Sequence, residues 1–208
     1  MSELGIVRDG AVYMRDGIIE DVGESTAIVR KHDSRGMERI DASGRVVMPG
    51  LVDAHTHLVF AGSREFELGM KLKGKTYMDI LNEGGGILKT VRDTRSASSD
   101  ELFDQSAQRL KTMLEHGSTT VEGKSGYGLD RKTELRIIET MRRLDAECGA
   151  DVVPTFMGAH AVPPEFSGRT DEYIQFLIDE VLLDLPSIAP VRFCDVFCEK
   201  GVFDFNQS

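Results

Sequence analysis

Two histidines separated by a single residue carry the clearest chemical signal in this sequence. His55 and His57 come at the end of an apolar run at 46–53, which predicts a β-strand. Side chains at positions i and i+2 of a strand point to the same face, so both imidazoles should project together. Neutral imidazole is a common protein ligand for divalent transition metals. The pair is therefore a candidate metal site, and two surface histidines placed by chance are the disfavoured alternative.

Three further side chains are candidates for binding a small molecule. His160 follows a later predicted strand, at the same end of that strand as the two histidines. Tyr127 lies in a glycine-rich segment at 122–128, where its hydroxyl could donate to a substrate oxygen. Arg64 follows the first strand, and a guanidinium there would suit bidentate binding of a carboxylate. The alternatives are a hydrogen-bonded loop residue for His160, a loop anchor for Tyr127 and a solvated side chain for Arg64.

Strands and helices alternate in the segment that must position these residues. Buried strands are expected at 46–57, 119–122, 152–156 and 193–197, and helices at 98–117, at 130–147 and from 171 onward. The helix at 130–147 has its apolar residues at Leu135, Ile138, Met141 and Leu144. Such alternation is typical of βαβ units and a parallel sheet. Active sites of parallel barrels lie at the carboxyl ends of the strands, where the candidates are found.

The first 47 residues have a different pattern, with short strand-like segments. Strand-like segments are seen at 11–14, 17–23, 28–30 and 41–47, and no helix is expected. The Asp-Gly pair at 16–17 predicts a hairpin turn between the first two. We therefore expect two domains, one at 1–47 and one at 48–208.

Composition limits the class of protein. The chain has 208 residues, 40% of them hydrophobic, and a net charge of −10. This apolar content is enough for a folded core, and the absence of a basic cluster disfavours a nucleic-acid surface. No apolar run approaches the roughly 18 residues of a membrane span, and the first residues do not form a secretory signal. The three cysteines are expected to be small buried thiols in a cytoplasmic protein: Cys148, Cys194 and Cys198.

Several motifs resemble those of a known enzyme family. The segment MPGLVDAHTH at 48–57 resembles the first-strand motif of the amidohydrolase superfamily, and HGSTT at 116–120 resembles its second-strand motif. More specific are EGKSGYGL at 122–129, GAHAVP at 158–163 and DVFCEKGVF at 195–203, which resemble the imidazolonepropionase family. The resemblance extends over essentially the whole chain.

This resemblance implies a fold and a chemistry. The fold would be α/β, the first half of a (β/α)8 TIM-type barrel preceded by part of a small β-sandwich domain. The reaction would be metal-dependent hydrolysis of a cyclic amide C–N bond in 4-imidazolone-5-propanoate, giving N-formimidoyl-L-glutamate in histidine degradation. By similarity, His55 and His57 would hold one Zn or Fe ion, and Arg64, Tyr127 and His160 would bind the substrate.

The family's remaining metal ligands and its acid/base glutamate lie on later barrel strands, so no catalytic residue is assigned within this chain. We therefore expect the chain to be part of a longer enzyme and to be inactive by itself. Two alternatives stay open: another amidohydrolase, such as a nucleobase aminohydrolase that would not need Arg64, and a non-catalytic half-barrel. The expected partners are a small-molecule substrate and further copies of the chain, without nucleic acid or membrane.

Overall fold

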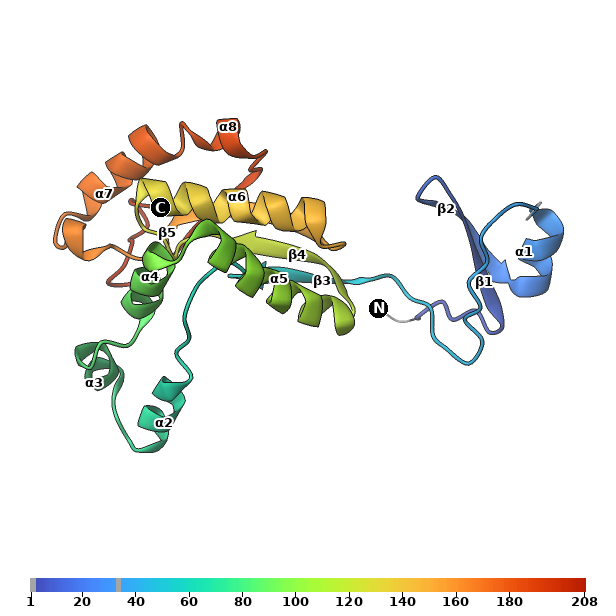
Figure 1. Cartoon of the computed structure of the whole chain (residues 1–208), viewed down its shortest axis with the longest axis horizontal. Helices are drawn as coiled ribbons and strands as arrows, with labels where there is room; N and C mark the ends of the chain where they lie inside the picture. Colours follow the sequence, from blue (N-terminus) through green and yellow to red (C-terminus); the bar gives the residue numbers. More distant parts are fainter. Residues whose placement is uncertain (1–2, 33–34) are drawn as a thin grey trace. The chain divides into compact units, whose positions relative to one another are not determined.

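The computed structural model describes residues 3–32 and 35–208. Contacts along the chain divide it into two compact units, 1–48 and 49–208 (Figure 1). The expected organisation into two domains stays a prediction.

The first unit is built on an antiparallel hairpin. Strands β1 (Gly10–Arg15) and β2 (Ile18–Glu24) pair along their length. Asp16 and Gly17 connect them with φ angles of 51° and 77°. Positive φ at both central residues is the geometry that Asp-Gly favours in a two-residue hairpin turn, so this part of the sequence prediction is confirmed.

The strand-like segment at 28–30 is instead part of a helix, α1 (Ser25–Lys31). Ile28 is only 7% exposed, and its side chain packs beside Gly23 of the hairpin. At the end of the helix, Lys31 and His32 both bind the carboxylate of Asp21, at 2.7 and 2.8 Å. These contacts with β2 outweigh the weak strand preference of the β-branched residues, so the expectation of no helix was wrong.

The expected strand at 41–47 is also absent from the described structure. The Asp41 carboxylate accepts hydrogen bonds from the backbone and hydroxyl of Ser43, which bends the chain into a turn. Val46 and Val47 follow with exposed fractions of 86% and 65% and no strand partner. The apolar run at 46–53 thus becomes a strand only from Leu51 onward.

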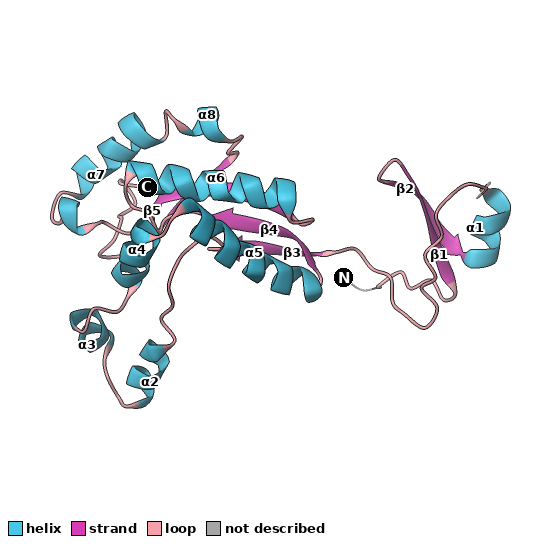
Figure 2. Cartoon of the chain, in the orientation of Figure 1, coloured by secondary structure: helices cyan, strands magenta, loops and turns pink. Residues whose placement is uncertain are grey.

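The second unit contains a parallel sheet of four strands in the order β3-β4-β5-β6. Figure 2 shows β3 and β4 side by side in this sheet. The strands are β3 (Leu51–Thr56), β4 (Ser118–Lys124), β5 (Asp151–Ala159) and β6 (Phe193–Val196). This arrangement confirms the α/β class with part of a TIM-type barrel preceded by a small β unit. The first strand was expected to be buried, but Leu51 and Val52 are 49% and 67% exposed, because β3 pairs only with β4 and forms an edge of the sheet.

Two long helices cover one face of this sheet. Helix α5 (Ser99–Glu115) packs on β4, and α6 (Arg131–Glu147) packs on β5 and on α5 (Figure 1). Ser98 and Glu101 form a capping box at the start of α5. The residues fully buried between the helices and the sheet include Leu102, Leu110, Val121, Ile137, Ile138, Met141 and Leu144. Each such apolar side chain contributes about 1.5–3 kcal/mol relative to exposure.

Shorter elements complete the unit. The connection from β3 to α5 contains α2 (Phe66–Leu72), α3 (Tyr77–Asn82) and α4 (Ile87–Ser96), none of which was expected. After β5 come η1 (Pro164–Phe166), α7 (Thr170–Phe176), the π-helical turn η2 (Leu177–Val181) and α8 (Leu185–Ile188). Within the residues that the structure describes, no helix is both long and apolar enough to cross a membrane.

The cysteines differ from the expectation of buried thiols. All three are free, with Cys148 half-buried and Cys194 and Cys198 exposed. Cys194 lies on β6, the second edge of the sheet, where no further strand covers it in the described structure.

Candidate active site

The sequence-derived candidates gather at the carboxyl ends of the parallel strands. His55 lies near the end of β3, and His57 follows that strand directly. Tyr127 follows β4, and His160 follows β5. The rings of these last three residues are in contact: the centroid distances from His57 are 4.9 Å to Tyr127 and 4.4 Å to His160. The tertiary structure therefore brings together residues that are about a hundred positions apart in the sequence.

His55 and His57 form a pair of imidazoles with ring centroids 6.2 Å apart. The strand end that carries them is held by Thr56, whose hydroxyl donates to the carbonyl oxygen of Glu122 at 2.7 Å. The Nδ1 atom of His57 is buried and has no hydrogen-bond partner in the described structure. A buried polar atom without a partner is unusual and indicates a missing ligand.

Burial keeps the central imidazoles neutral. It lowers the pKa of His57 to about 4, and the neighbouring His160 and His55 add to this shift. Burial also lowers the pKa of His160. Both rings are consequently uncharged at neutral pH, the state in which imidazole can bind a metal ion or accept a hydrogen bond.

These observations fit a metal ion, but only in part. His57 offers an unpartnered nitrogen, and His55 supplies a second imidazole beside it. A catalytic zinc site has three protein ligands and one open position. Among the described residues, no group of three or more His, Cys, Asp or Glu side chains could hold a metal ion. The two histidines would therefore provide part of a coordination shell.

His160 has a defined protonation pattern. Its Nδ1 lies 3.0 Å from the carbonyl oxygen of Gly126, which can only accept a hydrogen bond. The proton of the neutral ring is thus assigned to Nδ1, and Nε2 is left as an acceptor. A substrate N–H group is the natural partner for that nitrogen.

Arg64 and Tyr127 line one pocket of about 380 Å³. The full lining is Phe60, Gly62, Ser63, Arg64, Thr90, Arg109 and Tyr127. Burial raises the pKa of Tyr127, and the positive charge of Arg64 opposes the shift. The phenol is protonated at neutral pH and is able to donate a hydrogen bond, while the guanidinium can bind an anion.

The pocket also contains a guanidinium that the sequence did not point to. Arg109 projects from α5 and donates from Nη1 to the carbonyl oxygens of Leu58 and Phe60, at 3.2 and 2.9 Å. Its guanidinium carbon lies 3.7 Å from the centroid of the Phe60 ring. Arg109 thereby fixes the path of the chain between His57 and Arg64. Nothing local distinguishes it from the other charged residues of an amphipathic helix.

Lys124 lies beside these rings as a paired ion. Its ammonium binds Glu122 at 3.0 Å and Asp195 at 2.8 Å. Burial alone would lower the pKa of Lys124, but the hydrogen bonds to Asp195 and Glu122 hold it above its ordinary value. The side chain therefore stays protonated and joins β4 to β6 across the carboxyl ends of the strands.

Glu134 is a second residue that sequence reasoning missed. It belongs to the first turn of α6 and is completely buried. A signal was present, because position 134 falls on the same helix face as Ile137, Ile138 and Met141. A carboxylate in an apolar stripe is expected to have a specific polar partner.

The sequence of this chain is similar to those of known proteins. The model of the amidohydrolase family matches residues 38–80. The imidazolonepropionases of Clostridium tetani and Parabacteroides distasonis are 47% and 49% identical over 208 residues, and that of Geobacillus kaustophilus is 48% identical over 210 residues. Each comparison covers 100% of this chain and 50% of the relative, so the chain spans about half the length of the curated relatives it matches.

Proposed function

The chain is related to imidazolonepropionases along its entire length, and from this premise we propose that it carries part of an active site that opens the ring of 4-imidazolone-5-propanoate. Water would add across a ring C–N bond, and the product would be N-formimidoyl-L-glutamate. The observation that carries the proposal is the contact of His57, Tyr127 and His160 beside a pocket lined by Arg64.

The binding residues suit the two ends of this substrate. Arg64 would bind the propanoate carboxylate. This contact lies away from the reacting ring and would orient the ring in the site. The protonated hydroxyl of Tyr127 would donate to the ring oxygen. The Nε2 atom of His160, free because Nδ1 donates to Gly126, would accept from a ring N–H.

His55 and His57 would hold the Zn or Fe ion together with ligands outside the described residues. A bound divalent metal supplies Lewis acidity, which allows hydrolysis at neutral pH. The low pKa of His57 supports this role, because its nitrogen does not have to lose a proton before it binds. Two imidazoles suit either metal, so the proposal does not choose between them.

The decisive experiment compares substrates with the gene product that contains this chain, loaded with Zn or Fe. We expect hydrolysis of 4-imidazolone-5-propanoate and no hydrolysis of cytosine or guanine, with the first activity lost in His57→Ala. Turnover of a nucleobase at a comparable kcat/KM would overturn the proposal. It would favour a nucleobase aminohydrolase, for which a carboxylate-binding Arg64 has no use.

Two accompanying proposals concern the surroundings of the enzyme. A cytoplasmic location and association with further copies of the chain stay predictions. Both edges of the described sheet, β3 and β6, have a free side that another strand could pair with.

A further inference from the structure

The buried carboxylate of Glu134 is bound almost entirely by backbone amides of one loop. Gly126 N–H donates to its two oxygens at 3.2 and 3.1 Å. Gly128 and Leu129 N–H donate to Oε1 at 2.8 and 2.9 Å. These three amides lie on both sides of Tyr127, so a single side chain from α6 holds the segment that presents the phenol to the pocket.

Glycines at positions 126 and 128 allow this close approach of Glu134 to the loop. A Cβ atom on Gly128 would lie 2.6 Å from the backbone nitrogen of Glu134 and 2.9 Å from its Oε1. A Cβ atom on Gly126 would lie 2.5 Å from the carbonyl oxygen of Met157, and its φ is 103°. Leu129 has a φ of 53°, a strained conformation for a non-glycine residue. Its hydrogen bond to Glu134 helps to offset that strain.

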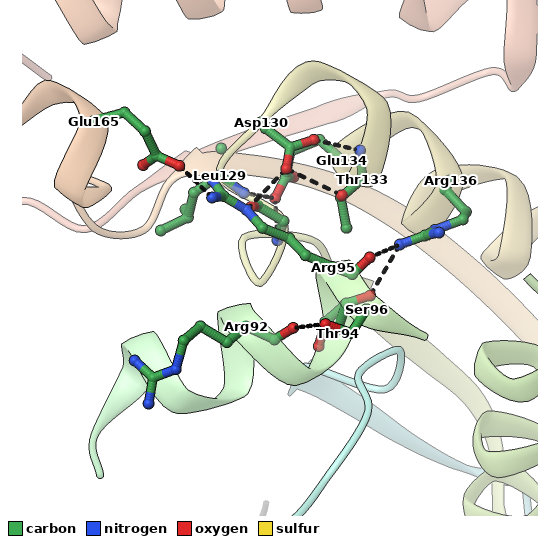
Figure 3. Close-up of polar contacts among 12 residues, drawn as sticks. Arg92, Thr94, Arg95, Ser96, Leu129, Asp130, Thr133, Glu134, Arg136 and Glu165 are labelled. Carbon is green, nitrogen blue, oxygen red and sulfur yellow. Dashed lines mark hydrogen bonds and ion pairs between the residues drawn. The ribbon is translucent and has the colours of Figure 1, made fainter. Parts of the chain in front are cut away.

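A second side chain holds the same loop from helix α4. Arg95 Nε donates to the carbonyl oxygen of Gly128 at 2.7 Å, and its guanidinium pairs with Asp130 and Glu165 (Figure 3). The N–H group of Gly128 thus donates to Glu134, and its carbonyl oxygen accepts from Arg95. At residue 126 the amide binds Glu134, and the carbonyl accepts from His160.

The contacts of Glu134 suit a carboxylate acceptor. Burial raises the pKa of Glu134 above its ordinary value, and the hydrogen bonds from Ser125, Leu129, Gly128 and Gly126 oppose that shift. These backbone partners are donors, which a carboxylate accepts and a protonated acid uses less well. The side chain also lies in the first turn of α6, where the helix dipole stabilises a negative charge.

We propose that Glu134 is a positioning residue, which fixes the Tyr127 phenol in the pocket and the Gly126 carbonyl that orients His160. This inference rests on the substrate-binding roles proposed above for Tyr127 and His160. Glu134 would act only through those two residues, since its carboxylate is fully buried under the loop.

The test uses Glu134→Gln in the metal-loaded gene product. Glutamine keeps the size but turns an amide N–H₂ toward the backbone donors. We expect kcat/KM for imidazolone propanoate to fall about 10- to 100-fold, as for a displaced binding group. Glu139→Gln on the same helix is the matched control, because Glu139 pairs with Arg142 at the surface and should leave the activity unchanged.

A double-variant cycle separates positioning from general stability. In a Tyr127→Phe background, Glu134→Gln should lower kcat/KM clearly less than it does in the wild type, because the hydroxyl that Glu134 positions is gone. If the two substitutions lower kcat/KM by factors that simply multiply in the double variant, the proposal is overturned. Gly128→Ala disturbs the same contact but keeps the Glu134 side chain, so this variant replaces Glu134→Gln if the latter does not fold. Its effect on kcat/KM should likewise be smaller in the Tyr127→Phe background.

Hydrogen exchange supplies a readout that does not depend on activity. Glu134→Gln should speed exchange at the amides of residues 126, 128 and 129 and leave those of α5 unchanged. Unchanged exchange at these amides would also overturn the inference. If the wild type does not hydrolyse imidazolone propanoate but the exchange result holds, the proposed function fails while Glu134 is still shown to fix the loop.

Discussion

Burial decides the chemistry of the individual residues at this site. His57 and His160 stack with an interplanar angle of 9°, and both are neutral because the charged form would lose its hydration. Lys124, in the same region, keeps its charge because two carboxylates pair with it. Two guanidinium groups line the neighbouring pocket, those of Arg64 and Arg109, and Arg109 donates to the carbonyl oxygens of Leu58 and Phe60.

Arg64 can be tested by a conservative change. Arg64→Lys keeps the positive charge but loses the planar pair of donors that binds a carboxylate through two hydrogen bonds. A hydrogen bond to a charged group is worth about 1.5–3 kcal/mol, so kcat/KM should fall roughly 10- to 100-fold, mainly through KM. Steady-state kinetics on imidazolone propanoate measure this, with Arg142→Lys on α6 as the surface control. Equal kinetic constants for wild type and Arg64→Lys would show that Arg64 does not bind the substrate carboxylate.

At the scale of elements, the connections between strands and helices do the positioning. The β3 end is held by Thr56, the loop after β4 by Glu134 and Arg95, and the segment after β3 by Arg109. Each of these bonds joins residues from different elements. Helix α1 shows the same effect in the first unit, where the hydrogen bonds of Lys31 and His32 to Asp21 attach a short helix to the hairpin.

The attachment of α1 predicts a response to acid. Hydrogen bonds from His32 and Lys31 lower the pKa of Asp21 from its ordinary value of 3.8 to about 2. The stability that this carboxylate contributes is therefore present above about pH 4 and is lost as the pH falls through about 2. Asp21→Asn should weaken the contact between α1 and the hairpin at neutral pH and should lose less stability than the wild type between pH 4 and pH 2.

NMR signals of the hairpin amides, followed from pH 5 to pH 2, measure this response. Glu20→Gln is the matched control on the same strand, because the contact of Glu20 with Arg15 is as long as 3.8 Å, and this variant should behave like the wild type. The same acid response in wild type and Asp21→Asn would show that the Asp21 carboxylate does not hold α1.

At the scale of the whole molecule, the described residues present half of a coordination shell. Two imidazoles lie at the carboxyl edge of the four-stranded parallel sheet, and no third side chain in the described ranges joins them as a ligand. The exposed apolar residues of the second unit include Leu51, Val52, Phe193 and Phe197. Large apolar side chains on open sheet edges favour association with further strands.

The isolated 208-residue polypeptide should consequently bind metal weakly and show no hydrolysis. The expected result after dialysis is a substoichiometric content of Zn or Fe by elemental analysis and no measurable turnover of imidazolone propanoate. Stoichiometric metal together with turnover that His55→Ala abolishes would contradict this. Such a result would mean that these residues, or further copies of the chain, complete the site.

The sequence by itself determined the features that depend on neighbouring residues. The His-x-His spacing, the Asp-Gly hairpin turn, the Ser98 capping box and the alternation of strands with helices all follow from local periodicity and local hydrogen bonds. The motifs around Tyr127 and His160 resemble those of one enzyme family, and this resemblance does not depend on any contact between the two side chains. What they could not show is that these two rings meet.

The tertiary structure decided the features that depend on distant partners. It placed Ile28 in a helix instead of a strand, exposed β3 at a sheet edge, and bound the buried Glu134 to the loop of Tyr127. The orientation of His160 depends on a carbonyl 34 positions earlier in the chain. Such outcomes depend on which surfaces become buried against each other, and burial is a property of the folded chain that no short segment contains.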